Sequence, residues 1–337
     1  MKEFTITCAS HESLCEAVRN AKEGDVIGIE KGVYDMSGSR NLVLVDKRNV
    51  TLTSVTGCAD DVVFKGSGFH KEGGYYLYKT KPHDEPVTLL SNCDQITISG
   101  ITFRDCNVHG VKISGESNIS NVTIDRCKFI DINERMIKGS KGSDDVRVPG
   151  MKITNNYFEN TQIPYESDHM PEFRGDYVTA IDMMVLDDAV ISGNTFVNIK
   201  GKYGNGRGAI FIWIFSKNIT VENNVFIKCN RNISFGNPHF DDPEVGKTKF
   251  YVDGGVIRKN TIINATRQGI ELSYTRGVKI TENTIYCADA TIAAIEDTGN
   301  EKERASKDLL IQNNVIRGFI DVPPAEIDKN IFINCNL

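Results

Sequence analysis

Hydrophobic residues recur along the chain in short runs that share one pattern. Each run has an aliphatic residue, an Asn three positions later, and a Phe or Ile two positions after that Asn. The runs lie at 153–158, 191–196, 221–226, 257–262, 280–285 and 311–316. The same frame occurs earlier at 98–103 and 124–129, where Ile101 and Cys127 take the place of the Asn. A pattern that returns every 23 to 38 residues is typical of a solenoid protein.

This spacing predicts an all-β fold, a right-handed parallel β-helix that forms a single domain over residues 1–337. Asn suits a fixed corner of each coil because it tolerates left-handed backbone geometry, and stacked Asn side chains can hydrogen-bond from coil to coil. Insertions at 162–177, 237–252 and 299–307 are polar and indicate surface loops. Asn-Gly and Asp-Gly turns between alternating strands are scarce, which argues against a β-sandwich.

A short helix is expected near the N-terminus, within residues 10–24, where it would cap the open end of the solenoid. Residues 13–16 (Ser-Leu-Cys-Glu) have the pattern of a capping box, and Gly24-Asp25 would end the helix. The apolar residues on its predicted buried face are Leu14, Ala17, Val18 and Ala21.

A second set of strands follows the Asn corners. In each strand an aliphatic residue precedes a variable one, so the variable side chain points outward if the aliphatic one points into the core. The predicted outward row is Lys112, Lys138, Asp182, Phe211, Ser234, Glu271 and Glu296. A parallel row two residues further on is Ser114, Ser140, Met184, Trp213, Gly236, Ser273 and Thr298. Neighbours in a row lie about 4.8 Å apart, so ionisable groups line a face that suits an extended polymer.

Composition limits the classes of partner. Apolar residues make up 40% of the chain and charged residues 25%, which is ordinary for a globular protein and excludes disorder. The net charge of −6 argues against a nucleic-acid surface, and no apolar run is long enough for a membrane helix. We therefore expect neither nucleic acid nor a membrane as partner, while the oligomeric state stays open.

The nine cysteines are scattered without a CxxC pair, which favours reduced thiols in the core of a cytosolic protein. The first residues, 1–8, lack a hydrophobic signal core. We therefore expect a cytoplasmic protein, or a secreted one if Met1 replaces a native leader.

With these residues in view, the chain resembles the right-handed parallel β-helix repeat proteins of the pectate-lyase-like superfamily. Residues 21–27 and 31–34 look like the opening of alginate-lyase and chondroitinase-B-type polysaccharide lyases. The segments similar to a subgroup of related, uncharacterised bacterial β-helix proteins are 136–138, 180–182, 229–236, 269–271 and 294–296. The chain departs from that subgroup at Phe211, where a His is usual, and at Asp297-Thr298, where an aromatic residue and an Arg are usual.

The resemblance implies an enzyme that cleaves a uronic-acid-containing polysaccharide or oligosaccharide by β-elimination. That reaction removes the proton α to a carboxylate, so it needs a base and cations that hold the developing negative charge. In this interpretation Lys138 is the catalytic base and Arg231 clamps the uronate. Asp182 either ligates a bridging Ca²⁺ or steers Lys138, and Glu271 is a second candidate Ca²⁺ ligand.

Other side chains on this face are candidates for substrate binding. They are Lys112, His109, Arg135, Trp213, Arg207, Ser234 and Arg267. Lys112 and Arg135 are also the cationic neighbours that a neutral lysine base needs, whereas Asp182 alone favours the charged form.

Two other classes of function remain open. A glycoside hydrolase needs two carboxyl groups about 5–5.5 Å apart for retention of configuration, and Glu271 and Glu296 on neighbouring coils suit that geometry. A non-catalytic glycan-binding protein would use Trp213 and the tyrosines at 75–78 as stacking platforms. The simpler interpretation of Lys138 and Asp182 is a cross-strand ion pair. Asp168-His169 and the acidic residues of the segment 241–244 have the composition of metal ligands but are typical of solvated loops.

Overall fold

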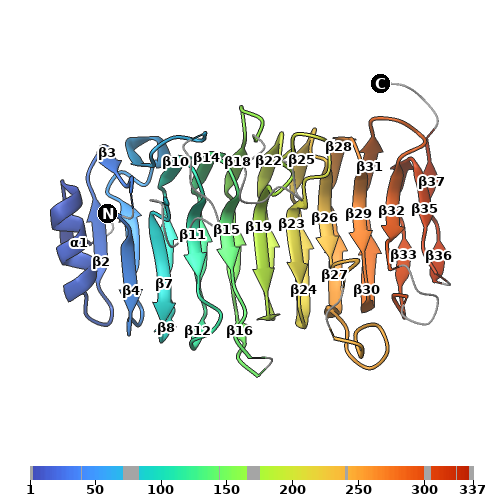
Figure 1. The fold of residues 1–337 in the computed structure, drawn as a ribbon, viewed down its shortest axis with the longest axis horizontal. Helices are drawn as coiled ribbons and strands as arrows, with labels where there is room; N and C mark the ends of the chain where they lie inside the picture. Colours follow the sequence, from blue (N-terminus) through green and yellow to red (C-terminus); the bar gives the residue numbers. More distant parts are fainter. Residues whose placement is uncertain are drawn as a thin grey trace.

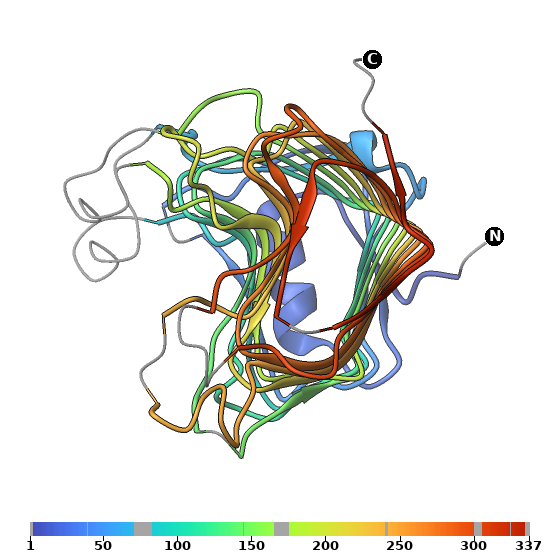
Figure 2. The ribbon, with the colours of Figure 1, turned by 90° about the vertical axis from the view of Figure 1, so that its right-hand side faces the viewer.

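The chain folds into one long stack of parallel β-coils (Figure 1). The computed structural model describes residues 3–38, 40–70, 83–143, 145–164, 175–239, 242–299, 305–323 and 325–333. Three sheets run along the stack, and a view close to its axis shows them as walls around a central core (Figure 2). All the strand pairings in these sheets are parallel, for example β11 with β15 and β15 with β19, which confirms the predicted all-β parallel β-helix.

The strands of the three sheets follow one another in each coil. Sheet A contains β1 (Ile6–Cys8), β2 (Val26–Ile29), β5 (Thr51–Ser54), β9 (Thr97–Ser99), β13 (Thr123–Asp125), β16 (Val148–Pro149), β17 (Lys152–Thr154), β20 (Leu186–Asp187), β21 (Val190–Ser192), β24 (Ser216–Glu222), β27 (Val252–Arg258), β30 (Thr275–Thr281), β33 (Leu310–Gln312) and β36 (Glu326–Asp328). Sheet B contains β3 (Gly32–Asp35), β6 (Val62–Lys65), β10 (Thr102–Cys106), β14 (Lys128–Ile132), β18 (Tyr157–Glu159), β22 (Thr195–Val197), β25 (Val225–Ile227), β28 (Thr261–Ala265), β31 (Thr284–Cys287), β34 (Val315–Arg317) and β37 (Ile331–Phe332).

Sheet C carries the outward row predicted from the sequence. It contains β4 (Leu42–Val45), β7 (Val87–Ser91), β11 (His109–Ile113), β15 (Arg135–Gly139), β19 (Thr179–Met184), β23 (Gly208–Trp213), β26 (Arg231–Phe235), β29 (Gln268–Leu272), β32 (Ala293–Asp297) and β35 (Phe319–Asp321). The short strands β8 (Cys93–Asp94) and β12 (Ile119–Ser120) form a separate pair, and the 3₁₀ turn η1 spans Ala59–Asp61.

A ladder of Asn side chains, all buried except the half-buried Asn330 at its end, fixes the corner between sheets A and B. Its members are Asn156, Asn194, Asn224, Asn260, Asn283, Asn314 and Asn330. The backbone N–H and the side-chain Nδ2 of Asn194 both donate to Asn224 Oδ1, at 2.9 Å and 3.0 Å. Asn194 Nδ2 also donates to the carbonyl of Ile153, at 2.9 Å. The predicted hydrogen bonding from coil to coil is therefore confirmed.

The left-handed residue at this corner is the one before the ladder Asn, which corrects our expectation. Asn155, Asn223 and Asn313 have φ angles of 57°, 55° and 56°, and Gly193 takes the same position with φ 70°. The left-handed residue turns the chain on the outside of the corner. The next Asn can then direct its amide inward, where it satisfies buried backbone groups.

The core holds a column of Phe rings at one position of sheet B. The stacked rings are Phe103, Phe129, Phe158, Phe196 and Phe226. Neighbouring ring centroids lie 4.7 to 4.9 Å apart, which matches the spacing of the strands that carry them. Full burial of each ring stabilises the fold by roughly 1.5–3 kcal/mol. The repeat of one aromatic position thus lets the rings stack at the spacing that the paired strands impose.

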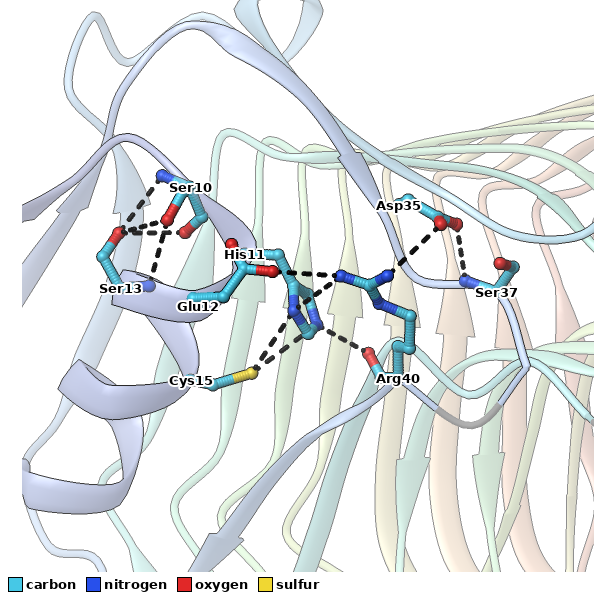
Figure 3. Close-up of polar contacts among 8 residues, drawn as sticks. All are labelled: Ser10, His11, Glu12, Ser13, Cys15, Asp35, Ser37 and Arg40. Atoms are coloured by element: carbon cyan, nitrogen blue, oxygen red, sulfur yellow. Dashed lines mark hydrogen bonds and ion pairs between the residues drawn. The ribbon is translucent and has the colours of Figure 1, made fainter.

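The N-terminal helix α1 spans His11–Asn20 and covers the open end of the stack. Ser10 is its N-cap: Ser10 Oγ accepts from the Ser13 N–H and Ser13 Oγ accepts from the Ser10 N–H, both at 3.1 Å (Figure 3). The capping box predicted at 13–16 is therefore wrong by three residues. It spans Ser10–Ser13, and the side chain of Ser13 has the role that we expected of Glu16. The helix also ends earlier than predicted, because Ala21 leaves helical geometry with ψ 133°. Lys47 Nζ donates to the terminal carbonyl groups of Arg19 and Ala21.

The predicted buried face of α1 is confirmed. Leu14, Ala17 and Val18 are buried against the core, and Ala21 follows them. Arg40 fastens the helix from outside: its Nη2 lies 3.2 Å from His11 Nδ1, and its carbonyl oxygen lies 3.1 Å from His11 Nε2 (Figure 3).

The Cys15 thiol beside His11 is part of this attachment. Cys15 Sγ lies 3.5 Å from His11 Nε2, but both nitrogens of that ring already interact with Arg40. Because burial also raises the pKa of Cys15, this pair is structural and carries no activated thiol.

The described cysteines are free thiols, as expected. The buried ones are Cys8, Cys93, Cys106, Cys127, Cys229 and Cys287. Cys335 lies outside the described residues. Within the described ranges, no helix has the length and apolar character needed to cross a bilayer.

A candidate active site on sheet C

The predicted outward row lies in register on sheet C, and we call it the central row. Its members follow one another as Lys112, Lys138, Asp182, Phe211, Ser234, Glu271 and Glu296. The residue before each member, such as Ile137 or Ile181, is buried in the core. The alternation in the sequence therefore predicted which side chains share this face.

These side chains are covered and do not project into open solvent, which corrects the expectation drawn from alternation alone. The exposed fraction is 8% for Lys138, 1% for Asp182 and 4% for Glu271. Two loops pack on the face from opposite ends of the strands. The 198–207 loop accepts hydrogen bonds from Arg231, and the segment 242–251 contacts Trp213 through Tyr251. Both loops lie on the same side of the coil in Figure 2.

A second row runs along the starts of the sheet C strands, and we call it the leading row. Its members are Glu85, His109, Arg135, Thr179, Gly208, Arg231 and Gln268. Most of these positions are paired directly, and Glu85 is placed by extending the Val87–Val111 pairing. Each member stands three residues before a residue of sheet C at the central-row position. That constant offset is visible in the sequence and could have revealed the row, but we predicted neither the row nor Glu85 as a site residue.

Long side chains of the leading row reach carboxylates of the central row one coil further on. Arg135 Nε donates to Asp182 Oδ2 at 2.7 Å. Arg231 Nε lies 3.3 Å from Glu271 Oε2, and Gln268 Nε2 donates to Glu296 Oε2 at 2.6 Å. This diagonal arrangement orients each carboxylate and holds the two rows together.

Asp182 is the centre of the first cluster. Its Oδ2 accepts from both Arg135 Nε and Lys138 Nζ, the latter at 2.8 Å, and its Oδ1 accepts from Trp213 Nε1 at 3.1 Å. Burial would raise the pKa of the Asp182 carboxyl, but the charges of Lys138 and Arg135 outweigh it and hold that pKa at about 2. The Arg135 guanidinium also stacks over the Tyr177 ring, 3.6 Å from its centroid.

Glu271 is the centre of a second cluster. Its Oε2 accepts from Ser234 Oγ at 2.9 Å, and its Oε1 accepts from Thr298 Oγ1 at 3.3 Å. Glu296 lies in register with Glu271 but has its own donor in Gln268. The two glutamates are therefore neighbours with separate hydrogen-bond partners.

Arg207 lies just before β23, between the two clusters. Burial lowers the pKa of Arg207, and the nearby charges of Arg135 and Arg231 lower it further. Burial is also the main cause that lowers the pKa of Arg231. The Nη1 donor of Arg135 has no hydrogen-bond partner, and only 2% of that residue is exposed. Three guanidinium groups and an unused buried donor thus create a place that favours an anion.

His109 and Lys112 lie one coil before the Asp182 cluster. His109 Nδ1 lies 2.7 Å from Glu85 Oε1, and both residues are at least 95% buried. Lys112 Nζ lies 3.6 Å from the same oxygen. The sequence placed His109 among the substrate-binding residues without its carboxylate partner.

Trp213 is half-buried instead of lying open on the face as predicted. Its ring stacks on Phe211, with centroids 5.2 Å apart, and meets Tyr251 edge-on at 6.1 Å. Since its indole N–H is bonded to Asp182, Trp213 serves first to position that carboxylate.

The remaining candidates lie at the margin or elsewhere. Arg267 is exposed and donates to the side chain of Asn205 on the 198–207 loop. Asp242 forms a loop ion pair with Lys249 at 2.7 Å, as a solvated loop charge would. Residues 75–78, residues 168–169 and Asp241 lie outside the described residues.

The donor sets at Asp182 and Glu271 do not fit the Ca²⁺ ion considered above. Both Asp182 oxygens accept hydrogen bonds, one of them from two cations, and Glu271 is occupied by two hydroxyl groups and Arg231. In the described part of the chain, no three His, Cys, Asp or Glu side chains gather in the manner of a metal site.

Comparison with solved structures finds the same fold in carbohydrate-related proteins. An alginate lyase from Paenibacillus has a TM-score of 0.58 at 17% identity, over 97% of this chain and 99% of that one. A polygalacturonase from Erwinia carotovora has a TM-score of 0.52 at 13% identity, over 98% and 93%. The tailspike protein of E. coli bacteriophage HK620, solved with a pentasaccharide, has a TM-score of 0.51 at 14% identity, over 96% and 62%.

Sequence comparison identifies the family. No curated protein sequence matches the chain. The family profile described as a right-handed β-helix region matches residues 87–322, which is more than half of the chain and includes all of the central row. The chain therefore belongs to the right-handed β-helix family.

Proposed function

We propose that this protein binds a uronic-acid-containing glycan across sheet C and cleaves it by β-elimination. The observation that carries the proposal is the convergence of Arg135, Arg207 and Arg231 beside Lys138 on one face. A buried donor without an acceptor, such as Arg135 Nη1, costs about 1–3 kcal/mol. A uronate carboxylate would supply the missing acceptor.

The fold supports a carbohydrate-active function, whereas the type of reaction depends on the residues of the site. The alginate lyase, the polygalacturonase and the tailspike protein share this fold at 13–17% identity, but their names indicate different activities. The cationic site favours elimination, because that reaction develops negative charge next to the uronate carboxylate.

The contacts suggest a role for each charged group. The three arginines would bind the carboxylate and stabilise the enolate-like charge. Lys138 donates to Asp182, so we assign it the role of a cation and of proton donor to the leaving oxygen, in place of the base expected from the resemblance. Asp182 would orient Lys138 and Arg135.

Product analysis on a panel of uronic-acid polysaccharides tests the proposal. Elimination leaves an unsaturated sugar that absorbs in the ultraviolet, whereas hydrolysis leaves new reducing ends without that absorbance. The proposal predicts the unsaturated product with at least one member of the panel. New reducing ends alone would contradict it, and a chain that binds a glycan without cleaving it would be a binding protein.

Hydrolysis is the second candidate, because Glu271 and Glu296 face the same side on neighbouring coils. Against hydrolysis, the two carboxylates have separate hydrogen-bond partners: Glu271 accepts from Ser234 and Thr298, and Glu296 accepts from Gln268. If the panel gives only new reducing ends, hydrolysis by Glu271 and Glu296 is supported, and substitution of either glutamate should then abolish cleavage.

A further inference from the structure

We infer that His109, held in place by Glu85, is the base of the elimination. This inference rests on the proposed function and adds the group that removes the proton, which the Lys138–Asp182 ion pair leaves unassigned.

The first argument is the hydrogen bond between the two side chains. His109 Nδ1 lies 2.7 Å from Glu85 Oε1. A carboxylate can only accept, so Nδ1 carries the hydrogen and Nε2 keeps a lone pair that can take a proton. Both residues are buried, with exposed fractions of 3% and 4%, which keeps the ring in one orientation.

The second argument is the set of groups around Glu85. Lys112 Nζ lies 3.6 Å from Glu85 Oε1, and His83 Nε2 lies 3.9 Å from Glu85 Oε2. On the other side of His109, Arg135 is the next member of the leading row. The Lys112 ammonium interacts with the Glu85 carboxylate, and that carboxylate stabilises the imidazolium that forms when His109 takes a proton.

The third argument is the position of the substrate carboxylate. Arg135 Nη1 is buried and has no hydrogen-bond partner, so a uronate oxygen would supply its missing acceptor. His109 and Arg135 are register partners, about 4.8 Å apart along the row. The proton to be removed sits on the carbon next to that carboxylate, and its removal by His109 requires a bound uronate to direct this carbon toward the coil that carries His109.

The step balances without a further reactant. His109 Nε2 takes the proton α to the carboxylate, and the electron pair of that C–H bond forms the new C=C bond. The bond from the β carbon to the leaving oxygen breaks, and the leaving oxygen takes a proton from the Lys138 ammonium. Exchange with water then removes the proton from His109 and restores the one on Lys138.

Two variants and a control test the assignment. His109→Gln should lower kcat by about 10²–10⁴-fold with little change in KM, because the base is lost while the arginines remain. Glu85→Gln should lower kcat by at least about tenfold, because the ring is no longer held in one tautomer. The control is His239→Gln, since the contacts of His239 in its loop are made by its backbone N–H and carbonyl.

Nitrogen NMR of the histidine rings gives a readout that needs no substrate. Wild-type His109 should show the tautomer with hydrogen on Nδ1, and Glu85→Gln should shift it toward a mixture. The opposite tautomer in the wild-type chain would overturn the inference whatever the activity. An active His109→Gln variant would overturn the base and leave elimination standing. A wild-type chain that eliminates no uronate glycan would overturn both.

Discussion

Arg135 Nε and Asp182 Oδ2 lie 2.7 Å apart, although the two residues are separated by 47 positions in the sequence. One stands in the leading row and the other in the central row of the next coil. The same oxygen accepts from Lys138, so two cations that would repel each other share one carboxylate. The geometry of the site therefore depends on the buried Asp182 carboxylate, which is neither the proposed base nor part of the substrate.

The first prediction concerns Asp182→Asn. It leaves Lys138 and Arg135 buried without their counter-charge, so we expect a loss of about 3 kcal/mol or more in the free energy of unfolding near neutral pH. Chemical denaturation monitored by circular dichroism measures it.

The pH dependence of that loss can be worked out from the wild-type chain. The pKa of Asp182 is about 2 in the folded state, below its ordinary value, so the carboxylate stabilises the fold above about pH 4 and loses this effect as the pH falls toward 2. The contribution is about 2 kcal/mol. The difference in stability between Asp182→Asn and wild type should therefore shrink in acid, and an unchanged difference would argue against this ion pair.

The second prediction concerns Lys138→Ala. Turnover should fall by about 100-fold or more, because the proton donor to the leaving oxygen is lost, while far-ultraviolet circular dichroism keeps the β spectrum. Lys152→Ala, at an exposed position of β17, is the matched control and should keep full activity. A fully active Lys138→Ala protein would remove Lys138 from the mechanism.

The sequence predicted the coil, the aromatic and Asn positions, and the central row, because each depends on residues at a fixed place in a repeat. It did not predict the leading row, although the spacing between Arg135 and Lys138 recurs between Arg231 and Ser234. Glu85 precedes Val87–Ser91, a strand that does not show the aliphatic-variable pattern followed by a charged residue as clearly as the later strands do.

The burial of the site could not be derived from alternation. Side-chain alternation tells which way Asp182 points, but the loops that cover it are the least regular parts of the repeat. The hydrogen bond from Trp213 to Asp182 joins two coils, and its existence depends on a ring orientation that the sequence does not specify.

The third prediction separates elimination from hydrolysis through Glu271→Gln. In elimination Glu271 only orients Arg231 and Ser234, so turnover should persist with a KM raised by up to about tenfold. In hydrolysis by a carboxylate pair the same variant should be inactive. Initial rates on one substrate decide between them, and an inactive but folded Glu271→Gln protein would count against our proposal.

The fourth prediction concerns the Asn ladder. Asn224→Ala removes donors to Asn260 Oδ1 and to the carbonyl of Ile191, and an acceptor for Asn194. We expect a loss of about 2–5 kcal/mol in the free energy of unfolding, because several buried groups lose their partners together.

A neighbouring position gives the control for the ladder. Asn223 has φ 55° and turns the corner, so Asn223→Gly should be tolerated with a change of about 0.5 kcal/mol or less. If Asn223→Gly and Asn224→Ala cost the same, the ladder would not be what holds the corner.

The central claim is that the cations of sheet C recognise a carboxylate, and calorimetric titration tests it most directly. The wild-type chain is titrated with a uronic-acid oligosaccharide and with the same oligosaccharide after reduction of its carboxyl groups to alcohols. We predict that the acid form binds at least about tenfold more tightly, a difference of about 1.4 kcal/mol. Equal affinity for the two forms would contradict the account.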